Sequence, residues 1–414
     1  MLQIDHIYEF LYQELFKEFE CWYLPSGIPK LGDISISDIS IFNLDLSSTS
    51  KIFFYDQEPF ILQLSKPYMD MFKWMDNYTI DEHVSLHASN NLPHNMYPLS
   101  TEEINFLVAN PQSVYKKKIL VTSEISPDVI KDSGKNNCHN LYYFFHGFAT
   151  LDWYRGYYAL NHNKLIVKPY NYDFITFNRI ITDDRSYRIY FVSLLKKAGL
   201  LDRGLVSFNV TNNIFDNWQD EVANPNSKLS EKSKQHIEQH LTDIDKLVID
   251  SPKLPGSASA DIPRGDDAFW HIVTETIFYY NKLHLTEKIF KPIVSKQPFM
   301  LLAAPGNLAY LKSYGFKTFD SVIDESYDTI QDNNLRIEAV VRQLNWYCNL
   351  TPGEKTDIIR QLEPIIDYNF RHFYGEFRHI ITRELLDNTK TLFKEIGYDD
   401  SHINYANIHH VLTH

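Results

Sequence analysis

The first 165 residues alternate between helical and strand-like hydrophobic patterns. Apolar side chains recur at helical spacing over residues 1–25, so this segment predicts an amphipathic helix. Beyond it, short runs of β-branched and aromatic residues bounded by turn residues predict strands, and the segments between them have helical spacing. The predicted strands cover 34–41, 51–55, 118–122 and 141–145, and the predicted helices cover 68–75 and 101–108. This alternation is typical of an α/β domain with an open parallel sheet.

A second series of elements begins near residue 173. Residues 173–179 predict a strand that leads into a helix, and Gly199 is placed to cap the end of that helix. The chain then becomes polar, with a predicted helix at 230–241 and a predicted strand at 247–249. Several Pro and Gly residues between 251 and 267 predict a long loop.

The most regular alternation follows, and it completes the predicted architecture. In order along the chain it predicts a strand at 272–280, a helix from Thr286, a strand at 299–303 and a helix ending at Gly315. The tail from residue 334 is helical, and Pro352 and Pro364 predict breaks in it. We therefore expect an α/β fold of two Rossmann-like lobes, 1–165 and 166–375, with closing helices at 376–414.

Composition limits the functions that this fold can serve. The chain has 414 residues and a net charge of -13, which disfavours non-specific nucleic-acid binding because Lys and Arg must neutralise phosphates there. No run approaches the roughly 18 apolar residues of a transmembrane helix, and residues 1–20 lack the basic start of a secretory signal. The three cysteines, Cys21, Cys138 and Cys348, lie far apart, as expected of reduced thiols. We expect a cytoplasmic protein without a membrane span.

Candidate chemistry is concentrated at 284–292, whose sequence is His-Leu-Thr-Glu-Lys-Ile-Phe-Lys-Pro. Thr286 is a good N-cap, so Glu287 and Lys288 fall in the first helical turn, where free backbone N–H groups favour an anion. Lys291 follows three residues later, so both ammonium groups can reach one diphosphate. Glu287 can accept hydrogen bonds from the two hydroxyls of a ribose. The pattern indicates a nucleoside-diphosphate site, and the alternative is a surface helix whose charges pair with each other or with solvent.

A longer stretch supports the first interpretation. Residues 271–320 resemble the C-terminal lobe of GT-B-fold glycosyltransferases, and the fucosyltransferase and exostosin-like branches, with phage-borne relatives, are the most similar. In the fucosyltransferase pattern, Thr-Glu-Lys opens the helix that holds the sugar nucleotide. The resemblance therefore implies that Glu287 faces the ribose and Lys288 the diphosphate. It also implies that Glu275 and Thr276 line the same crevice from the preceding strand.

Two arginines supply further positive charge. Arg179 lies at the end of a predicted strand, and Arg188 lies near the start of the next helix. Transferases of the resembled fold usually neutralise the leaving diphosphate with such groups and with helix termini, which implies no essential metal and no other cofactor. For Arg188 the alternative is an ion pair with Asp184 along its own helix.

The acceptor is expected to bind the N-terminal lobe. Two loops, at 56–59 and 146–153, follow predicted strands there, and ligands of open α/β sheets bind at the carboxyl ends of strands. Glu58, His146 and Asp152 are the candidates for the general base of an inverting transfer. Each also has a structural interpretation: a cap or ion pair for Glu58, a hydrogen-bonded loop residue for His146 and a helix cap for Asp152. A retaining transfer requires no separate base.

Three hypotheses follow. The leading one is a metal-independent glycosyltransferase that moves a hexose or pentose from a nucleotide diphosphate-sugar donor to an acceptor hydroxyl, with a glycan as the expected acceptor. In the second, the acceptor is a 5-hydroxymethylated base in phage DNA, extruded from the duplex for glucosyl or arabinosyl transfer in the host cytoplasm. The third is a non-catalytic nucleotide-sugar or glycan-binding protein. The sequence leaves open the donor, the stereochemistry and the oligomeric state.

Overall fold

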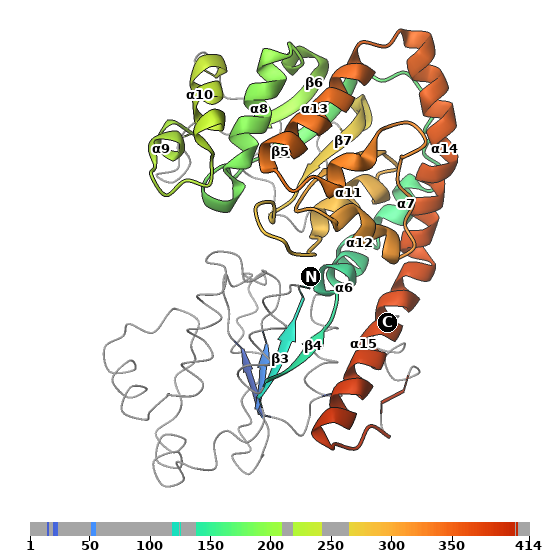
Figure 1. The fold of residues 1–414 in the computed structure, drawn as a ribbon. Helices are drawn as coiled ribbons and strands as arrows, with labels where there is room; N and C mark the ends of the chain where they lie inside the picture. Colours follow the sequence, from blue (N-terminus) through green and yellow to red (C-terminus); the bar gives the residue numbers. More distant parts are fainter. Residues whose placement is uncertain are drawn as a thin grey trace. The chain divides into compact units, whose positions relative to one another are not determined.

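The chain forms a mixed α/β structure with parallel sheets (Figure 1). The computed structural model describes residues 15, 20–23, 51–54, 118–123, 125, 138–208, 218–241, 265–401 and 403–404. Two compact units are present, one made of 1–152 with 379–414 and the other of 153–378. The α/β class is confirmed, whereas the lobe boundaries expected after 165 and 375 stay predictions.

The first unit contains a parallel sheet in the order β1-β2-β3-β4. Its strands are β1 (Glu20–Tyr23), β2 (Lys51–Phe54), β3 (Lys118–Thr122) and β4 (Cys138–Tyr142). Strands β2 and β3 lie within one residue of their predicted ranges. The end of the helix expected over 1–25 is wrong, because β1 pairs in parallel with β2 there. The aromatic pair in its sequence, Trp-Tyr, favours a pleated strand over a helix.

The segment after β4 also differs from its prediction. The strand expected at 141–145 ends at Tyr142, and Phe145 begins helix α6 (Phe145–Trp153). Phe145 and Phe148 are both buried. A short apolar run of this kind fits a buried strand and a buried helix equally well, so its periodicity did not distinguish them. Helix α15 (Glu376–Ile396) returns to this unit, where the Asn388 amide donates to the Tyr142 carbonyl at 3.0 Å.

The second unit contains a parallel sheet in the order β6-β5-β7-β8. Its strands are β5 (Tyr172–Asn178), β6 (Gly204–Phe208), β7 (Ala268–Thr274) and β8 (Phe299–Leu302). The strand predicted at 272–280 is therefore placed too late along the chain. After Thr274 the backbone leaves the sheet, and Ile277 and Phe278 reach the core from a loop. Because these side chains are apolar, the hydrophobic pattern predicted a strand that ends six residues beyond the end of β7.

The second unit also contains helices. They are α7 (Tyr157–Asn161), α8 (Tyr187–Lys197), α9 (Trp218–Ala223), α10 (Glu231–His240), α11 (Glu287–Val294), α12 (Asn307–Ser313), α13 (Asn333–Cys348) and α14 (Pro352–Tyr374). Short 3-10 turns occur at Asp183–Arg185, Leu201–Arg203, Gly265–Asp267 and Glu325–Thr329. The crossovers β5-α8-β6 and β7-α11-β8 run in opposite directions along the sheet, so right-handed connections put α8 and α11 on opposite faces. Helix α8 packs with α10 and α13, and α11 packs with α7 and α14 (Figure 1).

Two helix ends confirm their predictions, and one predicted break is wrong. Gly199 has φ 66 directly after the last residues of α8, as expected of a C-terminal cap, and Ser230 caps α10. Pro352 begins α14, but Pro364 lies inside that helix without ending it. Leu362 and Ile366 beside it are buried, so packing holds the helix across the missing hydrogen bond. Among the described helices, none is long and apolar enough to cross a membrane.

Candidate functional site

The carboxyl ends of β5 and β7 lie side by side in the middle of the second unit's sheet. From these neighbours the chain continues to β6 on one side and to β8 on the other. Open α/β sheets bind ligands at such a change of direction, in the crevice outside the strand ends. The Thr274 hydroxyl donates to the Phe177 carbonyl at 3.0 Å and joins the two ends. The loops at 179–186 and 275–286 extend from this point.

A chain of hydrogen bonds connects the loop after β7 to the start of α11. Lys288 Nζ donates to Thr286 Oγ1 at 3.1 Å, and Thr286 Oγ1 donates to Glu275 Oε2 at 2.5 Å. The Thr286 N–H donates to the second carboxyl oxygen of Glu275 at 3.1 Å. Lys288 Nζ also donates to Thr276 Oγ1 at 3.0 Å. The resemblance implied that Glu275, Thr276 and Lys288 line one crevice, and the structure brings them together around Thr286.

Thr286 has the expected capping role in this network. Its backbone is extended, and its hydroxyl oxygen accepts from the Lys288 N–H, so α11 begins at Glu287. Because the same hydroxyl donates to Glu275, the helix start and the loop after β7 are held in one arrangement. The positive end of the α11 dipole therefore lies at the carboxyl edge of the sheet.

Glu275, Thr276 and Thr286 of this network are buried, and the charges of the network influence one another. Burial raises the pKa of Glu275 above its ordinary range, although Lys288 and the hydrogen bonds from Thr286 oppose that shift. Glu287 Oε1 lies 3.4 Å from Lys288 Nζ, and the Glu287 side chain is 4% exposed against 29% for Lys288. Lys288 is therefore the more accessible member of this ion pair. A raised pKa shifts Glu275 toward its neutral form, which lowers the repulsion that an approaching anion meets.

The two candidate arginines lie in different environments. Arg179 follows β5 directly and is exposed. Arg188 is buried, and its guanidinium donates to the Ile180 carbonyl at 2.8 Å and the Thr274 carbonyl at 2.7 Å. Arg188 thus braces the ends of β5 and β7. The ion pair with Asp184 considered from the sequence is not among its contacts in the described chain.

Asp184 has another partner. Its Oδ1 accepts a hydrogen bond from the Tyr280 hydroxyl at 2.5 Å, and burial raises the pKa of the Asp184 carboxyl. This bond joins the loop after β5 to the loop after β7. Arg188 and Asp184 therefore both position the strand-end loops.

Lys291 lies one turn beyond Lys288 on α11. Burial lowers the pKa of His271 to about 3, and the charge of Lys291 adds to that shift. His271 is within β7, opposite Phe299 of β8, rather than at the end of its strand. Lys288 and Lys291 therefore have different neighbours, and their joint grip on one diphosphate stays a prediction.

The acceptor-side candidates belong to the first unit. Glu58 lies outside the described residues. His146 and Asp152 lie on α6, so the loop predicted over 146–153 is a helix. His146 is buried, and its ring packs edge-on against Phe145 with centroids 5.2 Å apart. The roles of these three residues as bases stay predictions.

With this geometry established, the chain was compared with known proteins. No family model, curated protein or solved structure matches it. Among the described residues, no three His, Cys, Asp or Glu side chains gather where they would hold a metal ion. Metal independence stays a prediction, and the chain's own geometry carries the proposal below.

Sequence reasoning missed two residues that shape the strand-end loops. The Tyr187 hydroxyl donates to the Glu275 carbonyl at 2.6 Å. Arg336, which is 1% exposed, donates to the Phe278 carbonyl at 2.8 Å and the Ala303 carbonyl at 3.0 Å. Phe278 is sandwiched between them, with its ring stacked 4.0 Å from Tyr187 and 4.2 Å from the Arg336 guanidinium carbon. The signal available for Arg336 was a lone charge at a buried position of a helical pattern.

Proposed function

We propose that this chain is a glycosyltransferase of GT-B type, with two Rossmann-like lobes, that transfers a sugar from a nucleoside-diphosphate-sugar to a hydroxyl of a glycan. The observation that carries this proposal is the hydrogen-bonded chain Lys288–Thr286–Glu275 at the start of α11. Buried titratable groups at the ligand-binding edge of an α/β sheet are typical of functional sites. No metal or other cofactor is required in this proposal.

Lys288 and the N-terminus of α11 are assigned to the diphosphate. When the bond between the anomeric carbon and the diphosphate oxygen breaks, negative charge develops on that oxygen. An ammonium group already fixed by Thr276 and Thr286 stabilises this charge without reorganising. Exposed Arg179, at the end of neighbouring β5, is assigned to the same diphosphate.

The second half of the reaction requires an acceptor hydroxyl. Its oxygen forms the new bond to the anomeric carbon, and its proton passes to a base in an inverting transfer or to the leaving diphosphate in a retaining one. His146, Asp152 and Glu58 are the proposed candidates for the base.

Glu287 has two proposed contributions. Its carboxylate lies 3.4 Å from Lys288 Nζ, which suits it to orient that ammonium group. The resemblance to fucosyltransferases adds a contact with the ribose. Replacing Glu287 by Gln separates the two, because the amide keeps a hydrogen-bond acceptor for the ribose but loses the charge that holds Lys288.

Donor binding is the first test. The full chain is screened by thermal shift against UDP-, GDP- and CMP-sugars with EDTA present, and positives are measured by calorimetry. We expect at least one nucleotide to bind, and Lys288→Ala to weaken it. Lys197→Ala, an exposed lysine in the last turn of α8, is the matched control. If every nucleotide fails, or if Lys288→Ala binds as tightly as the control, the site assignment is refuted.

Turnover is the second test. Release of free sugar from the bound donor distinguishes an enzyme from a nucleotide-sugar-binding protein. Incubation of donor with glycans and, separately, with DNA containing 5-hydroxymethylcytosine identifies the acceptor by mass. If the DNA gains the mass of a sugar and the glycans do not, the acceptor is the DNA base and not a glycan.

A further inference from the structure

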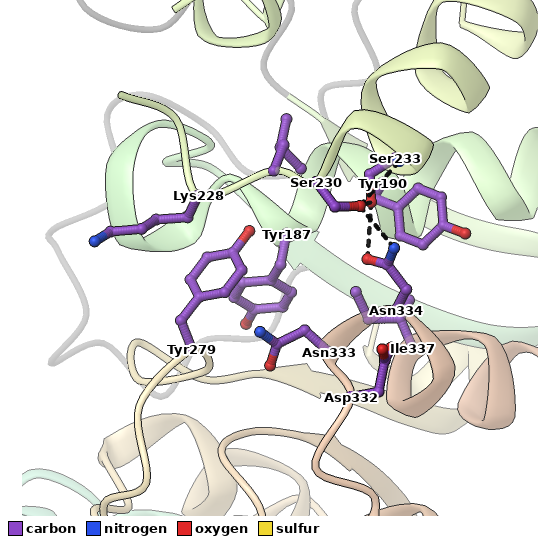
Figure 2. Close-up of a pocket in the computed structure, with 11 residues that line it drawn as sticks. Tyr187, Tyr190, Lys228, Ser230, Ser233, Tyr279, Asp332, Asn333, Asn334 and Ile337 are labelled. Atoms are coloured by element: carbon purple, nitrogen blue, oxygen red, sulfur yellow. Dashed lines mark hydrogen bonds between the residues drawn. The ribbon is translucent and has the colours of Figure 1, made fainter. Parts of the chain in front are cut away.

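A pocket opens beside the starts of three helices in the second unit (Figure 2). Its empty volume, counting the part open to solvent, is about 420 Å³. Its lining includes Tyr187, Lys228, Tyr279, Asp332, Asn333 and Asn334. They come from the start of α8, the segment before α10, the loop after β7 and the start of α13. Neither the proposed donor contacts nor the acceptor candidates include any of them.

The polar side of the pocket is fixed in advance. The Asn334 amide donates to Ser230 Oγ at 2.8 Å and accepts from Ser233 Oγ at 2.8 Å, which joins the starts of α13 and α10 (Figure 2). Such a closed network holds its members in one arrangement before any ligand arrives.

Asn333 and Asp332 present the remaining polar atoms. Asn333 Oδ1 accepts from the buried Arg336 at 2.7 Å, and Asn333 Nδ2 donates to no other described residue. One carboxylate oxygen of Asp332 accepts from the Leu335 N–H at 2.8 Å, which leaves the second oxygen to accept from a ligand. A hydrogen-bond donor and an acceptor therefore stand on consecutive residues.

The aromatic side of the pocket forms a corner. The rings of Tyr187 and Tyr279 meet edge to face, with centroids 6.2 Å apart and planes at 83°. One face of Tyr187 is already covered by Phe278 at 4.0 Å. The Tyr187 and Tyr279 rings are nearly perpendicular, so this pair does not sandwich a flat base. A puckered ring with C–H groups on its faces fits such a corner better than a planar one.

The charges of the lining do not favour an anion. Lys228 is the one cationic residue among the eleven that line the pocket, and its ammonium points away from the other side chains (Figure 2). Asp332 contributes one negative charge of its own. Hydroxyl groups, which both donate and accept, match a lining of one amide donor, one carboxylate acceptor and fixed hydroxyls.

We propose that this pocket binds one neutral, puckered monosaccharide unit. This binding depends neither on the donor site nor on the proposed function. The Tyr187 hydroxyl, which donates to the Glu275 carbonyl at 2.6 Å, connects the pocket to the donor-site loop.

Saturation-transfer NMR on the full chain tests the binding. The probes are D-glucose, D-galactose, N-acetyl-D-glucosamine and L-fucose, with uridine, adenosine and inorganic phosphate as the competing classes. We expect at least one saccharide to bind, with affinity about tenfold weaker in Asn333→Asp, which keeps the acceptor for Arg336 and removes the amide donor. Tyr279→Leu, which removes one wall of the corner, should weaken it similarly. Asn349→Ala, at the other end of α13, should bind as the parent does.

Two results would overturn the proposal. One is that no saccharide binds, and the other is that saccharide binding is unchanged in both Asn333→Asp and Tyr279→Leu. If a nucleoside or phosphate binds and both variants abolish that binding, the pocket is assigned to that ligand class instead. Donor binding is measured separately, so saccharide binding without any nucleotide binding retains the pocket and refutes the transferase. Nucleotide binding without saccharide binding refutes the pocket proposal and leaves the transferase proposal standing.

Discussion

The Thr286 hydroxyl lies 2.5 Å from Glu275 Oε2, and both residues are buried. One side chain therefore caps α11 and satisfies a buried carboxyl at the end of β7. Since Lys288 Nζ donates to the same hydroxyl, the position of that ammonium group depends on this contact.

Thr286→Val should destabilise the chain. Valine keeps the shape of threonine but leaves Glu275 without its hydroxyl donor and α11 without its cap, which together amount to about 2–3 kcal/mol. Thr286→Ser, which keeps the hydroxyl, should lose less than about 1 kcal/mol. Urea unfolding measures both, and equal losses in the two variants would show that the hydroxyl contributes little.

Lys288→Ala should weaken binding of the diphosphate donor by about 1–3 kcal/mol, as expected for loss of a charge-assisted hydrogen bond. Calorimetric titration of parent, Lys288→Ala and Lys197→Ala with the same nucleotide measures the effect. Circular dichroism of each variant establishes that the fold persists. A loss shared by the Lys197 control would point to global charge rather than to a contact.

The stability of the chain should depend on pH through Glu275. Its pKa is raised by folding, so its contribution is fully present below the ordinary value near 4.5 and is lost as pH rises through the raised value. Glu275→Gln removes this titration. The stability of the variant relative to the parent should therefore increase as pH rises above about 4.5. Unfolding free energies of both proteins across that interval test the sign, and a constant difference would contradict the shift.

The contribution of His271 to stability should have the opposite pH dependence. Burial and Lys291 lower its pKa to about 3, so its contribution to stability is present above the ordinary value of 6.5 and is lost as pH falls toward 3. His271→Gln should reduce this acid sensitivity. Thermal unfolding of parent and variant between those two pH values measures it, and parallel curves would show that His271 does not titrate with folding.

Parts of the fold and of the site were accessible from the sequence because local chemistry decides them. Thr286 before Glu287 and Lys288 is a cap signal that requires no tertiary information, and Gly199 is similar. The end of β7 was not accessible, because Ile277 and Phe278 are as apolar in a buried loop as in a strand. The role of Arg188 was hidden for another reason. Its partners are the backbone carbonyls of Ile180 and Thr274. Every residue has such a carbonyl, so the sequence does not indicate which ones an arginine will bind.

The Tyr187 side chain links the proposed saccharide pocket to the proposed donor site. Tyr187 lines the pocket, and its hydroxyl donates to the backbone carbonyl of Glu275. The side-chain carboxyl of Glu275 belongs to the Lys288 network. Thermodynamic linkage requires any such influence to be mutual: a sugar that tightens nucleotide binding by some factor must itself be held tighter by that factor when the nucleotide is present. In a Tyr187→Phe variant, we expect the affinity for the sugar to be the same with and without the nucleotide, and the affinity for the nucleotide to be the same with and without the sugar.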